Sequence, residues 1–233
     1  MTADVQTFPS PASWAQACAD CLTDALAAAP GPHAVFAGSG GSTPAPIYAR
    51  MKDANLDWSR MVVTLIDERY VPETSPDSNA RLLKQTLLTG PAAKASFVPL
   101  YTPAVTVDRA AAEATKRLRP HGRFDAVLLG MGEDGHICSM FPHSPTLKTL
   151  LTPDLPPAIY GVPPGRDGLA PSMERLTINL PYLTQAGRVV LAITGKQKRA
   201  VFERDAAGDP AITPIAALLA AKVPLEVLWT EAA

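Results

Sequence analysis

A run of three glycines, two carboxylates and a histidine, residues 130–136, carries the residue types best suited to chemistry in this 233-residue chain. It directly follows an apolar segment, residues 124–129, that is typical of a buried strand. Ligands of open α/β sheets bind beyond the carboxyl ends of the strands, so a histidine at such a place is a candidate acid or base. The run therefore predicts an enzyme in which His136 reacts and Glu133 or Asp134 orients its ring.

The same run matches the Gly-x-Gly-x-x-Gly pattern of dinucleotide-binding folds. In that motif the variable positions approach a pyrophosphate, and Glu133 and Asp134 would bring two negative charges against it. The run also lies past the middle of the chain, whereas the dinucleotide motif belongs to an opening strand–helix–strand unit. Both observations argue against nicotinamide or flavin binding.

A second glycine turn, residues 38–43, follows the apolar segment 34–37 and precedes Pro44. Glycines allow neighbouring backbone N–H groups to converge on an anion, and the start of a helix adds a favourable dipole. The turn is not a Walker A loop, because no lysine precedes its hydroxyl residues. We expect a cradle for a phosphate monoester, the alternative being a tight turn capped by a hydroxyl side chain. The candidate ligands are Ser39, Gly40, Gly41 and Ser42.

Charged residues also follow the apolar run 61–66. Asp67 or Glu68 could act as a base or as an orienting group, and Arg69 could bind a substrate anion. An internal network of ion pairs that closes the strand would explain the same cluster. The sequence leaves these two interpretations open.

Two further basic residues stand at the starts of predicted helices. Arg81 lies one turn into a helix opened by Ser78 and Asn79, and Lys196 heads a helix that follows the segment 189–193. A lysine at that edge of the sheet can reach a phosphate as a point charge. We expect Lys198 and Arg199, in contrast, to lie on the solvated face of the helix.

The cysteines do not indicate a metal or redox site. Cys18 and Cys21 fall on the apolar face of the first predicted helix, and the chain offers no second pair of ligands for zinc. Cys138 lies close to His136 in sequence but has no other activating base, so a thiol nucleophile is not expected.

Composition excludes several classes of function. The formal net charge is −1, with 21 basic and 22 acidic residues, which argues against nucleic acid or an anionic membrane surface as a partner. No segment reaches the roughly 18 uninterrupted apolar residues of a spanning helix, and the first residues do not have the pattern of a signal peptide. Three cysteines do not form a disulfide framework. We expect a soluble, cytoplasmic protein whose partner is a small molecule.

Apolar strand-like and amphipathic helix-like segments alternate along the chain, which favours a mostly parallel sheet with helices on both faces. We therefore predict a doubly wound, Rossmann-like α/β fold in a single domain, residues 1–233. The segment 142–171 holds eight prolines and little periodicity, so it is expected to be a long ordered loop or an excursion from the sheet. The expected strands cover residues 34–37, 61–66, 97–100, 124–129, 175–180, 189–193 and 226–229. The expected helices cover residues 11–29, 44–52, 79–88, 107–119, 196–206 and 214–221.

Taken together, the order and spacing of these motifs resemble the 6-phosphogluconolactonase family, within the superfamily that also holds glucosamine-6-phosphate deaminase. The resemblance spans nearly the whole chain. Two departures stand out: Ile137-Cys138 replaces the usual Thr-Ala after the histidine, and His143 replaces the glycine expected after Phe-Pro. The motifs that carry the resemblance are residues 39–44, 67–72, 78–79, 129–136, 141–142, 175–177 and 195–196.

The resemblance implies hydrolysis of 6-phospho-D-glucono-1,5-lactone to 6-phospho-D-gluconate in the oxidative pentose phosphate pathway, with no metal or cofactor. It implies that His136 activates water for attack on C1, which suits an imidazole because free histidine has a pKa of about 6.5. The phosphate would bind the glycine turn and Lys196, with Arg81 or Arg175 near the phosphate or the developing oxyanion. Asp67 matches a proton-transfer carboxylate of the deaminase. A deaminase or isomerase, and a non-enzymatic sugar-phosphate-binding protein, are the alternatives; the oligomeric state is open.

Overall fold

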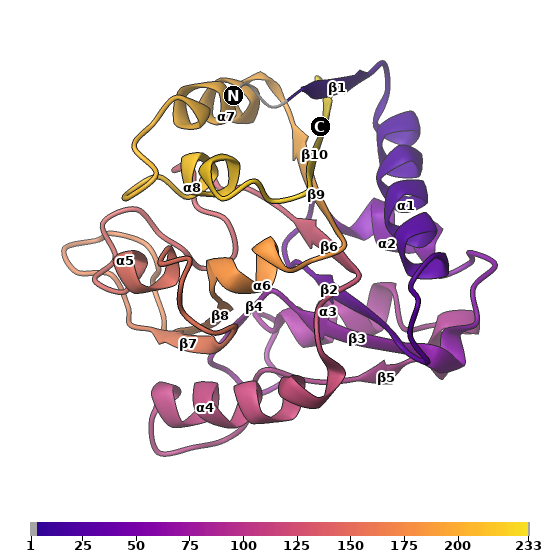
Figure 1. The fold of residues 1–233 in the computed structure, drawn as a ribbon, viewed down its shortest axis with the longest axis horizontal. Helices are drawn as coiled ribbons and strands as arrows, with labels where there is room; N and C mark the ends of the chain where they lie inside the picture. Colours follow the sequence, from indigo (N-terminus) through magenta and orange to yellow (C-terminus); the bar gives the residue numbers. More distant parts are fainter. Residues whose placement is uncertain (1–3, 233) are drawn as a thin grey trace.

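The computed structural model describes residues 4–232, and its centre is a sheet of seven parallel strands (Figure 1). The strands are β1 (Val5–Phe8), β2 (Ala34–Gly38), β3 (Met61–Leu65), β5 (Ser96–Phe97), β6 (Ala126–Leu129), β9 (Arg188–Thr194) and β10 (Leu225–Thr230). Their order across the sheet is β1-β10-β9-β6-β2-β3-β5. The predicted parallel α/β architecture is confirmed.

Helices cover both faces of this sheet. Figure 1 shows α1 and α2 on one side, and α6, α7 and α8 on the other. The α-helices are α1 (Pro11–Ala27), α2 (Ala45–Met51), α3 (Asn79–Thr86), α4 (Val107–Leu118), α5 (Leu147–Leu150), α6 (Leu180–Thr184), α7 (Lys196–Ala206) and α8 (Pro214–Ala220). Short 3-10 helices occupy Trp58–Arg60, Gly90–Lys94 and Arg119–His121. The doubly wound arrangement therefore follows from apolar strands that need cover on both sides.

The opening helix illustrates why the predicted segments fold where they do. Ser10 caps α1 by accepting a hydrogen bond from the Ser13 N–H at 3.1 Å, and Pro11 fits the first helical position. Trp14 packs into the core, and its Nε1 donates to the Leu228 carbonyl at 3.0 Å. Cys18 is also buried there, and burial raises the pKa of its thiol. The first cysteine of the pair is thus a packing residue.

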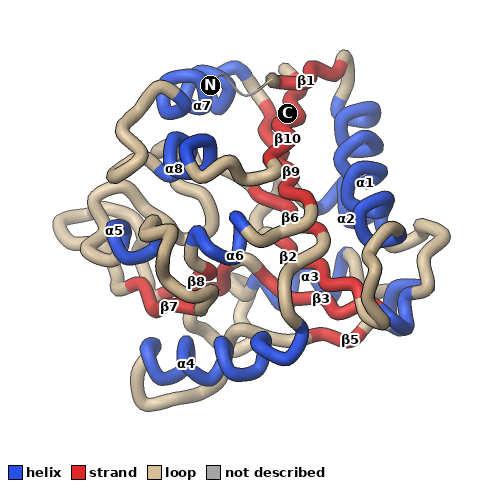
Figure 2. The backbone as a smooth tube through the Cα atoms, in the orientation of Figure 1, coloured by secondary structure: helices blue, strands red, loops and turns tan. Residues whose placement is uncertain are grey.

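A second, smaller sheet holds β4 (Asp67–Arg69), β8 (Arg175–Ile178) and β7 (Ile159–Val162) in that antiparallel order. Figure 2 shows β7 and β8 beside the first sheet. Sequence patterning predicted only β8, and not its place outside the main sheet. The proline-rich segment 142–171 is an excursion that supplies α5 and β7. These strands have three or four residues each, too few for a clear periodic pattern.

Other elements also differ from expectation. The strand expected at residues 97–100 is only Ser96–Phe97, and the one expected to end at Leu180 ends at Ile178. Leu180 begins α6 instead, where Pro181 fits the first turn of a helix. The edge strand β1 was not predicted, because its four residues alternate weakly and its two central residues are exposed.

The sheet changes direction between β2 and β6. The chain builds outward from β2 to β3 and β5 on one side, then returns to place β6 on the other side of β2. The segments that follow β2 and β6 consequently diverge from two neighbouring strand ends. Such a topological switch point is where open α/β sheets bind ligands.

The backbone at His143 adopts a conformation that favours glycine. His143 has φ +67°, a left-handed conformation that L-residues adopt at a cost of about 1–2 kcal/mol, and this is the position where the family resemblance anticipates glycine. We expect His143→Gly to raise the free energy of unfolding by about 0.5–1 kcal/mol, measured by urea denaturation. The control His33→Gly, at an exposed position without positive φ, should lower it. Equal losses in both variants would contradict the strain.

Candidate active site

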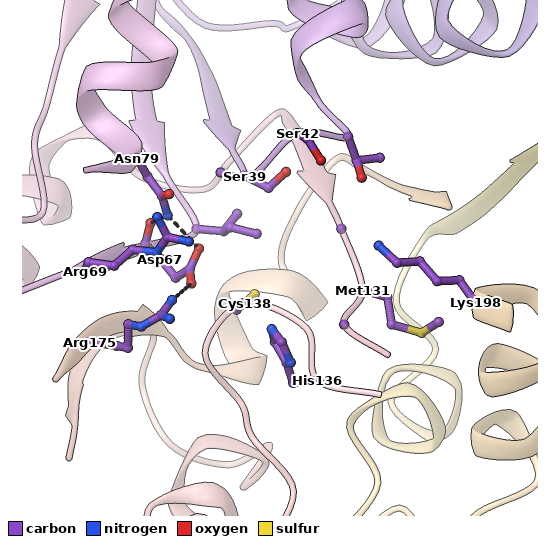
Figure 3. A pocket seen from close by; sticks show the side chains of 16 residues that line it. Ser39, Ser42, Asp67, Arg69, Asn79, Met131, His136, Cys138, Arg175 and Lys198 are labelled. Carbon is purple, nitrogen blue, oxygen red and sulfur yellow. Dashed lines mark hydrogen bonds and ion pairs between the residues drawn. The ribbon is translucent and has the colours of Figure 1, made fainter. Parts of the chain in front are cut away.

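A cavity of about 230 Å³ opens at the switch point, between the segments that follow β2, β3 and β6 (Figure 3). The small sheet contributes Arg175 to its wall, α3 contributes Asn79, and α7 contributes Lys198. The walls are polar, with cationic side chains, hydroxyl groups, one carboxylate and one imidazole. This composition suits a small, charged, hydroxylated ligand.

The imidazole of His136 is held by two neighbours. Its Nδ1 lies 2.5 Å from Asp134 Oδ1, and its ring stacks at a tilt against Phe141, with 4.2 Å between the ring centroids. Burial alone would raise the pKa of Asp134, but the hydrogen bond with His136 and the charge of that ring outweigh burial and lower it. Because Asp134 occupies Nδ1, Nε2 is the nitrogen that can exchange a proton with a ligand.

Glycine is required where the chain passes this ring. A Cβ built on Gly132 would overlap the Cε1 and Nδ1 atoms of His136, so only glycine lets the backbone pass so close. Gly135 has φ +87°, and a Cβ there would overlap the Asp205 carboxylate. Glu133 faces α7 instead, where its Oε2 accepts from Gln197 Nε2 at 3.3 Å. Of the two predicted carboxylates, Asp134 is therefore the one that contacts the imidazole.

The glycine turn after β2 offers unpaired donors. Among residues 4–232, none of the N–H groups of Gly40, Gly41, Ser42 and Thr43 donates a hydrogen bond to another protein group. Gly41 has φ +88°, and a Cβ on Gly40 would overlap the amide of Asn79. Ser39 Oγ and Asn79 Oδ1 are buried and have no hydrogen-bond partner in the described part of the chain. Buried polar groups normally have partners, so these atoms mark a place for a ligand.

Alternation along β4 separates the roles of its three charged residues. Asp67 and Arg69 line the cavity, and Glu68 points away from it. The Glu68 carboxylate is fully buried and accepts hydrogen bonds from the N–H groups of Arg69, Asn79 and Ala80 and from Ser78 Oγ, at 2.7–3.1 Å. Burial raises the pKa of Glu68, and these hydrogen bonds oppose that rise. Glu68 therefore holds the start of α3 rather than a ligand.

Asp67 and Arg175 meet across β4 and β8. The Asp67 Oδ2 atom accepts from Ser139 Oγ at 2.6 Å and lies 3.9 Å from Arg175 Nη1, and Figure 3 shows both residues at the cavity wall. Burial lowers the pKa of Arg175, and Asp67 opposes that change. The Arg175 guanidinium carbon lies 5.7 Å from the Phe141 ring centroid, and the Arg175 Nε atom has no hydrogen-bond partner among residues 4–232. Arg175 thus has donors available for an anionic group.

The cavity brings together most of the residues singled out in the sequence. Arg81 and Lys196 lie elsewhere: the Arg81 guanidinium donates to the Thr74 carbonyl at 2.9 Å, and Lys196 Nζ pairs with Glu231 at 2.8 Å. The predicted residues that line the cavity are Ser39, Gly40, Gly41, Ser42, Asp67, Arg69, Arg175 and His136. Glu133 and Asp134 flank it.

Among the cavity residues that were not predicted as ligands, Lys198 and Asn79 carry polar side chains that could contact a ligand. Lys198 was expected to face solvent, but it extends from α7 toward the glycine turn (Figure 3). Lys196 and Lys198 are about 200° apart around a helix, so only one of them can face the cavity, and the sequence does not tell which. Asn79 was noticed only as a helix opener; its place after Ser78 in the motif was the available signal.

Residues 4–232 give little support to a metal site, a membrane-spanning helix or a cysteine nucleophile. No group of three or more histidine, cysteine or acidic residues there could hold a metal ion, and no helix is long and apolar enough to span a membrane. Cys138 lines the cavity but is buried, and burial, with the charge of Asp67, raises the pKa of its thiol. A thiolate nucleophile is therefore not favoured at this site.

The fold and cavity define an α/β protein with a ligand site at the switch point of its sheet. A family model described as glucosamine-6-phosphate isomerases/6-phosphogluconolactonase matches residues 9–229, so the chain belongs to this family. It is 39% identical over 230 residues to a 6-phosphogluconolactonase of Caulobacter vibrioides, covering 97% of each chain. It is 41% identical over 234 residues to one of Rhizobium meliloti, covering 98% of this chain and 99% of the relative.

Solved structures agree with these relationships. A 6-phosphogluconolactonase from Shewanella baltica superposes with a TM-score of 0.90 at 32% identity, covering 98% of each chain. A monomeric glucosamine-6-phosphate deaminase superposes with a TM-score of 0.74 at 18% identity, which shows a shared fold alone.

Proposed function

We propose that this chain hydrolyses 6-phospho-D-glucono-1,5-lactone to 6-phospho-D-gluconate, a step of carbohydrate metabolism in the oxidative pentose phosphate pathway. Relatives about 40% identical over nearly the whole chain are named 6-phosphogluconolactonase, which supports this activity. The observation that carries the proposal is one cavity with a histidine–carboxylate pair and a turn of unpaired N–H groups. Because the cavity takes residues from Ser39 to Lys198, we propose that the chain acts as one unit.

The histidine–carboxylate pair suits the activation of water. Nε2 of a neutral His136 removes a proton from water as the oxygen attacks C1 of the lactone. Asp134, on Nδ1 at 2.5 Å, stabilises the imidazolium that forms. The tetrahedral intermediate then breaks its bond to the ring oxygen, and Nε2 returns the proton to that oxygen. The products are a carboxylate and a hydroxyl group; the second proton is released to solvent.

Negative charge develops on the C1 oxygen during attack, and a nearby cation stabilises it. Arg175 and Arg69 both line the cavity, and the Nε atom of each is buried with no partner in the part of the chain that the structure describes. Arg69 also donates to the Asp77 carbonyl through Nη1, which fixes its position. We assign the oxyanion to this arginine pair rather than to Arg81, whose guanidinium is turned toward Thr74.

The phosphate of the substrate is best accommodated at the glycine turn. The N–H groups of the glycine turn, the Ser39 hydroxyl and the ammonium group of Lys198 all border the same part of the cavity. Since α2 has only seven residues, the argument rests on these donors and not on a helix dipole. Lys198 takes the role that sequence patterning gave to Lys196.

Asp67 is left for the sugar hydroxyls. Its Oδ2 already accepts a hydrogen bond from Ser139, and Arg175 lies beside it. Because His136 both removes and returns the proton, lactone hydrolysis needs no second proton-transfer group. The deaminase alternative draws on Asp67 in the cavity, but the names of the full-length relatives favour the lactonase.

Replacing the proposed base tests the activity directly. We expect His136→Ala to lower kcat/KM for the lactone about 10²–10⁴-fold, because general acid–base catalysis contributes that much. Acid release, corrected for spontaneous hydrolysis, measures turnover, and calorimetry with 6-phosphogluconate measures binding, which should persist. The control is His33→Ala, which alters an exposed histidine outside the cavity. Undiminished turnover by His136→Ala would refute the proposed role.

A pair of lysine variants tests the phosphate subsite. Lys198→Ala should raise KM for the lactone by about tenfold or more and leave kcat nearly unchanged, because a charged hydrogen bond to bound substrate is lost. Lys196→Ala, two residues away on the same helix, should change KM by less than about twofold. Steady-state kinetics on both proteins decides the matter. A larger effect at Lys196 than at Lys198 would reverse the assignment.

A further inference from the structure

Tyr48 lies buried behind the glycine turn and is absent from the cavity wall. Its hydroxyl donates to the Ser39 carbonyl at 2.7 Å, and no other donor to that oxygen is found within residues 4–232. Burial raises the pKa of the phenol, so the hydroxyl stays protonated and remains a donor. The site already described makes no use of this bond.

The bond fixes the direction of one peptide unit. In a trans peptide the C=O and the following N–H point in opposite directions. With the Ser39 carbonyl turned toward buried Tyr48, the N–H of Gly40 is turned the other way, toward the cavity that Ser39 and Gly40 line. If this peptide flipped, it would present a carbonyl oxygen to a bound anion.

Within residues 4–232, no other hydrogen bond holds this peptide: the Ser39 carbonyl accepts only from Tyr48, and the Gly40 N–H donates to no protein group. A flip of the Ser39–Gly40 peptide changes ψ of Ser39 and φ of Gly40, and glycine at position 40 leaves that φ largely unrestricted. Gly41 already adopts φ +88°. A hydrogen bond from a rigid donor is therefore the restraint that selects the orientation with the N–H in the cavity.

The surroundings of Tyr48 make it a rigid donor. Its ring packs edge-on against Phe36, with centroids 6.2 Å apart at 86°. Gly38 makes room for the hydroxyl, since a Cβ there would lie 2.5 Å from the Tyr48 oxygen. Strand β2 and helix α2 thus hold the phenol in one place beneath the turn.

We propose that Tyr48 is a positioning residue that locks the Ser39–Gly40 peptide with its N–H toward the phosphate. The inference rests on the proposed phosphate subsite and adds a residue that no ligand would touch. It predicts an effect on the binding of phosphorylated ligands and not on the chemical step.

Tyr48→Phe removes the hydroxyl and keeps the ring. We expect the Kd for 6-phosphogluconate, measured by calorimetry, and the KM for the lactone both to rise about tenfold, with kcat within about twofold of the unaltered protein. The matched control is Tyr182→Phe, another buried tyrosine, which stacks on Phe124 outside the cavity. It should leave Kd and KM unchanged.

The possible results separate the two proposals. Unchanged Kd and KM with a lowered melting temperature would show a purely structural tyrosine and overturn the inference. A loss of kcat at unchanged KM would overturn it as well. If the unaltered protein binds 6-phosphogluconate without hydrolysing the lactone, the proposed function fails, and the Kd values of the two tyrosine variants still decide the role of Tyr48.

Discussion

The pairing of β2 with β6 is the constraint on which the site depends. These strands are hydrogen-bonded neighbours, with Phe36 opposite Ala126 and Ala37 opposite Val127, so their carboxyl ends lie side by side, about 4.8 Å apart. The chain leaves β2 toward the flank that holds β3 and β5, and it leaves β6 toward the flank that holds β9 and β10. The glycine turn after β2 and the histidine loop after β6 therefore start side by side and then diverge. The space between them is the cavity.

The remaining elements hold these two loops in place and complete the cavity. Glu68, in the middle of β4, accepts hydrogen bonds from the start of α3, and that places Asn79 against Gly40. The proline-rich excursion builds the small sheet, through which Arg175 reaches Asp67. Helix α7 supplies Lys198 to one wall and contacts Glu133 through Gln197. The cavity between the two loops thus depends on packing from three distant segments.

Sequence patterning located the features that depend on local chemistry. Apolar runs followed by glycines predicted β2, β6 and the turn after each. A short stretch of sequence is enough for this, because it shows both the apolar residues of a buried strand and the glycines that allow a tight turn. Sequence patterning favoured Lys196 over Lys198 as the cavity lysine, whereas the structure places Lys198 there, because that choice depends on how α7 is rotated against the sheet. It left Glu133 and Asp134 open for the same kind of reason: the tight turn that brings Asp134 onto Nδ1 needs Gly132 against the ring. The short strands β4 and β7 exist only through pairing with β8.

The central claim is that the substrate lies across the switch point, with its phosphate at the glycine turn and its lactone carbonyl at His136. A crystal structure with bound 6-phosphogluconate tests this most directly. We predict the phosphate against the N–H groups of Gly40 and Gly41 and within reach of Lys198 Nζ, and the carboxylate beside His136 Nε2. A phosphate bound beside His136, or one held by Lys196 outside the cavity, would contradict the account.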